Sequence, residues 1–167
     1  GHGWEPLAVT LAAEGPLHRS FRAAGVPSLA LDSAHRRQYV WAAIRLARAI
    51  RDVDVVHAHL FDAAFVSTVA GAIARKPVVI TRHEGPALVR RAAGGGFNRN
   101  LYYLLDRLVL VRAAAVIAPS TAVREEVVAL GAGRSRVHKI LLGADMQRLG
   151  AADRARAEAL RREFAAR

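Results

Sequence analysis

The sequence predicts an α/β fold built on an open, parallel, doubly wound (Rossmann-like) sheet of about six strands. Short runs of β-branched residues alternate with longer helical stretches, which is typical of a parallel sheet covered by crossover helices. Several runs are apolar on both faces, as at residues 53–56 and 78–80, and this favours strands buried between two helical layers. A chain of 167 residues without cysteine is long enough to bury such a core without disulfides.

The predicted strands and helices alternate along the whole chain. Strands are predicted at residues 7–12, 28–31, 53–58, 77–81, 115–118 and 137–141. Helices are predicted at residues 17–24, 34–51, 63–74, 97–112, 121–130 and 151–166. Gly25 and Gly131 end two of these helices, and Ser120 or Thr121 caps the helix after the fifth strand. Residues 86–98 are the one long irregular segment, and loops of that length are usually functional or disordered.

The formal net charge of +11 indicates an anionic partner, either nucleic acid, anionic lipid or a phosphorylated small molecule. The helix predicted at 34–51 is basic and amphipathic, so it could lie on an anionic membrane; alternatively, its apolar stripe covers the sheet and its arginines are solvated. Tyr102 and Tyr103 lie among further arginines, a pattern that a membrane interface or a nucleic acid would also suit. No apolar run reaches the roughly 18 residues that a membrane span needs.

Polar residues gather after the predicted strands, where an open parallel sheet binds its ligands. They are His57, His59 and Asp62 after the third strand, Arg82, His83 and Glu84 after the fourth, Ser120 after the fifth, and Gly143 and Asp145 after the sixth. The cation, imidazole and carboxylate after the fourth strand suit a phosphate or a hydroxyl-rich ligand, with His83 able to move a proton near neutral pH. The alternative is a surface Arg–Glu pair beside an exposed histidine.

His57 and His59 stand two residues apart on one strand, so both imidazoles face the same side, as in a metal-binding pair. The alternative is a buried strand histidine beside one at the mouth of the strand. Ser120 is interpreted as a helix cap whose hydroxyl, or whose helix N-terminus, could also contact an anion.

The order of these motifs resembles the N-terminal domain of a glycosyltransferase of family 4, in the GT-B fold group that uses nucleotide-sugar donors. The matching segments are residues 1–3 (GHG) with 9–11 (VTL), 14–17 (EGPL), 54–59 (DVVHAH), 77–83 (PVVITRH), 116–125 (VIAPSTAVRE) and 137–145 (VHKILLGAD). Two positions depart from the family pattern. Leu142 stands where the family has Asn before Gly143, and Ala114 replaces an acid before the fifth strand.

The resemblance implies an acceptor-binding domain. Residues 1–145 would form the N-terminal domain without the family's first strand, and residues 146–167 a linker and helix toward a C-terminal donor domain. By position, the resemblance makes His83 catalytic and Gly143 and Asp145 interdomain residues. It places the acceptor beside His59, Asp62, Arg82, Glu84 and Ser120, and it implies neither metal nor cofactor.

The implied partners are a nucleotide-sugar donor, held mainly by the C-terminal domain, and a glycan or lipid-linked acceptor. The resemblance also implies a cytoplasmic enzyme of cell-envelope glycan synthesis, at the inner membrane face if it is peripheral. The arginines fit a phosphorylated or lipid-linked acceptor, or an anionic membrane surface, better than nucleic acid. Two alternatives remain: a stand-alone basic module that binds anionic membrane or nucleic acid with steep salt dependence, and a histidine-centred metallohydrolase that holds stoichiometric zinc.

Overall fold

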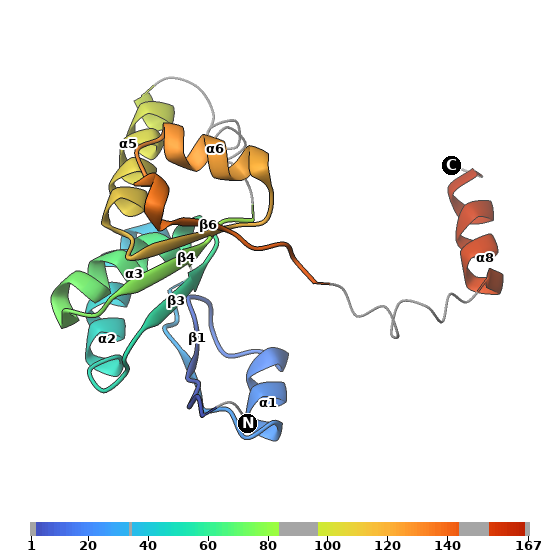
Figure 1. The fold of residues 1–167 in the computed structure, drawn as a ribbon. Helices are drawn as coiled ribbons and strands as arrows, with labels where there is room; N and C mark the ends of the chain where they lie inside the picture. The colour runs from blue at the N-terminus through green and yellow to red at the C-terminus, as the bar shows by residue number, and fades with distance from the viewer. Residues whose placement is uncertain (1–2, 34, 84–96, 144–153, 166–167) are drawn as a thin grey trace.

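A computed structural model describes residues 3–33, 35–83, 97–143 and 154–165 (Figure 1). The strands are β1 (Ala8–Thr10), β2 (Ser28–Ala30), β3 (Val56–His59), β4 (Val78–Thr81), β5 (Ala115–Ala118) and β6 (Val137–Lys139). The helices are α1 (Pro16–Ala23), α2 (Tyr39–Ala49), α3 (Phe61–Ala74), α5 (Phe97–Arg112), α6 (Thr121–Ala129) and α8 (Arg154–Ala165), with short 3-10 turns η1 (Arg36–Gln38) and η2 (Arg134–Arg136). Each predicted strand and helix is present, with ends shifted by a few residues.

Every strand pair is parallel, which confirms the predicted fold class. β1 pairs with β2, and β3, β4, β5 and β6 pair in that order. The hydrogen bonds thus divide the strands into a pair and a four-stranded sheet, because β1 and β3 are not paired with each other in the described part of the chain.

The helix predicted over residues 34–51 is shorter than expected and begins with η1. The Gln38 side chain accepts a hydrogen bond from the His35 backbone N–H (3.0 Å) and caps this turn. Within α2, the Arg45 guanidinium donates to the Leu31 carbonyl at 2.6 Å. This arginine is exposed, and its hydrogen bond ties α2 to the residue that follows β2.

One face of the four-stranded sheet packs against α3, α5 and α6. Val78 and Ile80 of β4, with Val116 and Ala118 of β5, are buried in one apolar cluster with residues of these helices. Burying each of the larger side chains stabilises the fold by roughly 1.5–3 kcal/mol. This packed core fixes the positions of the strands, and therefore of the strand ends at the edge of the sheet.

The β1–β2 pair shares a second core with β3. Val9 of β1, Leu29 of β2 and Val56 of β3 pack against the same buried cluster of α2 and α3 residues. Thr10 points to the other face, where its Oγ1 lies 3.1 Å from Nε2 of His18 on α1. Helices therefore cover both faces of this pair, as expected for a doubly wound fold.

The last helix, α8, stands apart from the sheet in Figure 1, and its side chains from Arg156 onward are exposed. None of the helices in the described ranges has the length and hydropathy that crossing a bilayer requires.

Candidate functional site

The carboxyl ends of β3, β4, β5 and β6 bring most of the predicted site residues to one edge of the sheet. Because the four strands are parallel and adjacent in this order, the residues that follow them lie side by side. His59 ends β3, His83 follows β4, Ser120 follows β5 and Gly143 follows β6. Glu84, Asp145 and the loop predicted at 86–98 lie outside the described residues, apart from the start of α5.

Three imidazoles, of His57, His59 and His83, form a row that we call the histidine row. The rings of His57 and His59 lie with centroids 4.4 Å apart, and His59 Nδ1 lies 3.3 Å from His83 Nε2. At this distance the N–H of one ring can donate a hydrogen bond to the ring nitrogen of the other. All three histidines are exposed, so a ligand at this edge of the sheet can reach the row.

The inner end of the row is held by Thr81, whose buried hydroxyl shares a hydrogen bond with His57 Nε2 (2.7 Å). His57 keeps part of its surface in solvent. Desolvation of the remainder lowers the pKa of its imidazole below the usual value, and positive charge on His59 lowers it further. His57 therefore stays neutral more readily than a free histidine, and the Thr81 hydroxyl holds its ring in place.

The lowered pKa of His57 predicts a stability that falls with acidification. As the pH falls, the imidazole of the unfolded chain takes up a proton near its ordinary pKa of about 6.5, whereas the imidazole of the folded chain does so only at a lower pH. The stability of the folded state therefore has its full value above about pH 6.5 and declines as the pH falls through that value. We expect the difference in unfolding free energy between the wild type and His57→Gln to shrink from pH 7.5 to pH 5.5, as measured by urea denaturation. A difference independent of pH would contradict this assignment.

Between the histidine row and α3 the backbone is strained. Leu60 has φ 68°, a left-handed conformation that is rare for a bulky residue. It joins the end of β3 directly to the first turn of α3, where Asp62 lies. Such strain persists where the surrounding structure enforces it, and it clusters at functional sites. The tight turn keeps His59 and Asp62 at the same edge of the sheet.

Asp62 lies in a small cluster of aromatic and cationic residues. Its Oδ1 is buried without a hydrogen bond in the described structure and lies 3.6 Å from Arg36 Nε. The Arg36 guanidinium also sits over the ring of Tyr102, 4.7 Å from its centroid. Burial and the negative charge of Asp62 raise the pKa of Tyr39. Asp62 is therefore partly exposed and lies close to the charge of Arg36, and the sequence offered no pattern that pairs the two.

Arg82 is placed differently from the sequence expectation of a ligand-facing cation. Its side chain is 2% exposed and donates two hydrogen bonds to Asp106 of α5, each 3.0 Å. Its backbone N–H donates to the Ile117 carbonyl at 2.9 Å. The geometry thus gives Arg82 a positioning role: it anchors the end of β4 to β5 and α5, and His83 follows immediately.

Asp106 was not among the residues singled out from the sequence, although a signal was present. Asp106, Val109, Leu110 and Ala113 recur at helical spacing and are all buried. A carboxylate in the apolar register of an amphipathic helix needs a buried partner, and Arg82 is that partner.

Ser120 is the N-cap of α6, as predicted. Its hydroxyl accepts a hydrogen bond from the Val123 backbone N–H at 3.2 Å. Gly143 lies exposed beyond β6. Within the described ranges, no group of three histidine or carboxylate side chains is arranged to hold a metal ion, so the geometry offers no support for the metallohydrolase hypothesis there.

Comparison with known proteins identifies the family. The model of glycosyltransferase family 4 matches residues 1–148, most of the chain. The chain belongs to glycosyltransferase family 4. A search of curated proteins gave no match.

Solved structures show that this family-4 chain has the GT-B fold. Anabaena Alr3699/HepE in complex with UDP and glucose is 18% identical, with a TM-score of 0.63, and the match covers 84% of this chain and 37% of that one. The same protein with UDP-glucose is 19% identical, with a TM-score of 0.62 and coverage of 88% and 42%. A putative UDP-N-acetylglucosamine 2-epimerase from Listeria monocytogenes is 15% identical, with a TM-score of 0.50 and coverage of 77% and 35%. The chain thus spans less than half of each of these proteins, consistent with an N-terminal domain.

Proposed function

We propose that this chain is the acceptor-binding half of a glycosyltransferase that transfers a sugar from a nucleotide-sugar donor to a glycan or lipid-linked acceptor. The observation that carries the proposal is the exposed contact between His59 and His83, at the strand ends of a family-4 domain. Open parallel sheets bind their ligands at this edge. Neighbours of the same fold crystallised with UDP and with UDP-glucose support a nucleotide-sugar donor.

His83 is the proposed catalytic residue. In the transfer, an acceptor hydroxyl bonds to the sugar carbon and loses its proton, while the bond from that carbon to the nucleotide phosphate breaks. An imidazole can accept or donate such a proton. His59, at 3.3 Å from His83, can relay that proton and orient the ring. No step in this scheme requires a metal or an organic cofactor.

The acceptor is proposed to lie along the same edge. Asp62 next to the row accepts hydrogen bonds from sugar hydroxyls, and the Ser120 hydroxyl and the first turn of α6 face a phosphate or hydroxyl group. Two further residues enter the proposal from the sequence alone. Glu84 is proposed to bind the acceptor, and Asp145, together with Gly143, is proposed to lie between the two domains. Arg82 contributes indirectly, because its hydrogen bonds to Asp106 and to the Ile117 carbonyl fix the backbone that precedes His83.

We also propose the domain organisation that the resemblance implies, with residues 1–145 as an N-terminal domain that lacks one strand and residues 146–167 leading to a donor domain. The divided sheet supports the missing strand. β1 and β3 pack on one core, yet each is paired along a single edge in the described structure. A further parallel strand between them would join the two sheets into one.

The backbone directions agree with this position for the strand. Ala8 donates its N–H to Pro27 of the loop before β2, and Val56 donates to Pro77 of the loop before β4. Backbone groups of successive residues point to opposite edges, so those of Val9 and His57 face the unpaired edges. Amide exchange tests the arrangement: Val9 and His57 should exchange more slowly in the natural polypeptide than in residues 1–167 alone. Equal exchange would remove the extra strand from the proposal.

Sugar transfer is the test of the function itself. The natural polypeptide that carries these residues, incubated with a panel of nucleotide sugars and a lipid and glycan extract, is expected to release nucleoside diphosphate and to label the extract. Residues 1–167 alone are expected to show no sugar transfer, because they do not include the proposed donor domain. Transfer by residues 1–167 alone would refute the half-site proposal, and no transfer from any donor by the natural polypeptide would refute the function.

A further inference from the structure

Helix α5 carries an apolar stripe that faces away from the core. Leu101, Leu104, Leu108 and Val111 recur every three or four residues, and they are 42%, 62%, 47% and 39% exposed. The opposite side of the helix, with Val109 and Leu110, is buried against the sheet. Single exposed leucines are ordinary, whereas four aligned along three turns of one helix form a contiguous apolar face.

The stripe is bordered by cations. Arg107 and Arg112 of α5 are exposed on its two sides, and Asp106, the acidic residue closest to it in the helix, is buried in its pair with Arg82. An apolar ridge between arginines, without an exposed carboxylate in the described turns of α5 from Leu101 onward, matches the interface of a membrane that contains anionic lipids.

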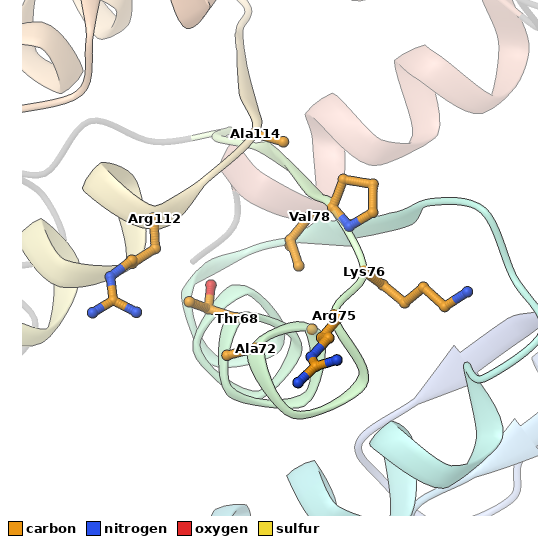
Figure 2. A pocket seen from close by; sticks show the side chains of 9 residues that line it. Thr68, Ala72, Arg75, Lys76, Val78, Arg112 and Ala114 are labelled. Atoms are coloured by element: carbon orange, nitrogen blue, oxygen red, sulfur yellow. The ribbon is translucent and has the colours of Figure 1, made fainter.

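A basic pocket continues the stripe at the C-terminal end of α5. The pocket has a volume of about 360 Å³ and is lined by Thr68, Arg75, Lys76, Val78, Arg112 and other residues. Figure 2 shows Arg112 on one side, Arg75 and Lys76 on the other, and Val78 between them. Cations at the rim and apolar side chains at the floor fit a phosphate headgroup with its attached acyl region.

We propose that the α5 stripe and the Arg75–Lys76–Arg112 pocket form one docking surface for a membrane that contains anionic phospholipid. Leu104 and Leu108 enter the region between headgroups and acyl chains, and the three cations contact lipid phosphates. The surface differs from the basic helix at residues 34–51, which the sequence offered as one candidate for this role; there Arg36 lies near Asp62, and Arg45 donates to the Leu31 carbonyl. This inference goes beyond the proposed sugar transfer and does not depend on it.

The surface also has a useful position relative to the candidate site. Near its N-terminus, α5 approaches α3, where the Tyr102 ring lies 5.5 Å from that of Phe61. Its C-terminus lies at the opposite edge of the sheet, beside the start of β4. A membrane lying along α5 would therefore pass next to the edge that carries the histidine row.

Vesicle co-sedimentation of the chain tests the proposal with matched variants. The test variant is Leu104→Glu/Arg112→Gln, and the control is Leu17→Glu/Arg19→Gln on α1, where both side chains are also exposed and the net charge changes equally. We expect the wild type to bind vesicles of phosphatidylglycerol and phosphatidylcholine but not phosphatidylcholine alone. The test variant should bind at least about tenfold more weakly, and the control should bind like the wild type.

Each other outcome overturns the proposal. Equal loss in the two variants means that net charge alone drives binding, and equal binding to both vesicle types removes the anionic lipid. Binding of a DNA oligonucleotide that outcompetes the vesicles at the same salt concentration assigns the surface to nucleic acid instead. Release by inorganic phosphate, but not by chloride at equal ionic strength, assigns it to a free anion. Circular dichroism of the variants checks that each remains folded.

Discussion

Asp106→Ala is expected to destabilise the domain by about 3–5 kcal/mol, the largest stability effect that we predict for a single change. The substitution leaves the Arg82 guanidinium 2% exposed without the carboxylate that accepts both of its hydrogen bonds. An uncompensated buried charge is among the most costly defects in a core. Urea denaturation monitored by circular dichroism measures the loss. Exposed Asp52→Ala is the matched control and should change stability by less than about 0.5 kcal/mol.

A double substitution separates the charge from the packing. Replacing both partners, as in Arg82→Met/Asp106→Leu, removes the buried charge altogether, and apolar residues of similar volume often replace a buried ion pair at little cost. We expect this variant to recover most of the stability that Asp106→Ala loses. If the double variant is as unstable as the single one, the pair acts through its hydrogen-bonding geometry and the electrostatic explanation is wrong.

His83→Ala is expected to lower kcat/KM of the natural enzyme by about a hundredfold to ten-thousandfold, the range for removal of a general acid or base. The expectation rests on the proposed function and on the place of His83 at the exposed end of the histidine row. Steady-state transfer of labelled sugar measures it. His138→Ala is the control, because His138 is also exposed and lies on β6 of the same sheet. Because its ring is outside the row, we expect an unchanged rate.

The pH profile distinguishes catalysis by His83 from a structural role. The wild-type rate should depend on a group that titrates near neutral pH, and this dependence should disappear in His83→Ala. A variant that loses activity while it keeps the wild-type pH profile would show that another group transfers the proton.

Local patterns were sufficient for the secondary structure. The strands predicted at 77–81 and 115–118 became β4 and β5, the strand predicted at 53–58 begins only at Val56, and Ser120 caps α6 as expected, because these features depend on residues close together in the chain. Boundaries were less predictable. The Gln38 side chain that caps η1 and the left-handed Leu60 before α3 depend on neighbours that periodicity does not describe.

The edge that carries the candidate site followed from the sequence as well, since a parallel sheet aligns the ends of its strands. His59 and His83 are 24 residues apart in the chain and are brought to 3.3 Å by the register of β3 with β4. Their contact was implied by two adjacent parallel strands. The partners of Arg82 and Asp62 were not implied by the sequence, because the same local sequence is compatible with a solvated or a buried charge.

For this chain, then, the alternation of apolar runs and helices was enough to establish the fold class, the order of elements and the edge of the sheet at which most of the predicted site residues lie, because these depend on patterns repeated over many residues. Packing settled the role of each charge. Arg82 became an internal anchor because Asp106 occupies the buried register of α5, and Arg112 stays at the surface because it lies on the exposed side of α5, outside the register of Leu110 and Ala113. Burial depends on contacts between distant segments, and the number of arginines in a sequence does not specify which of them the core will enclose.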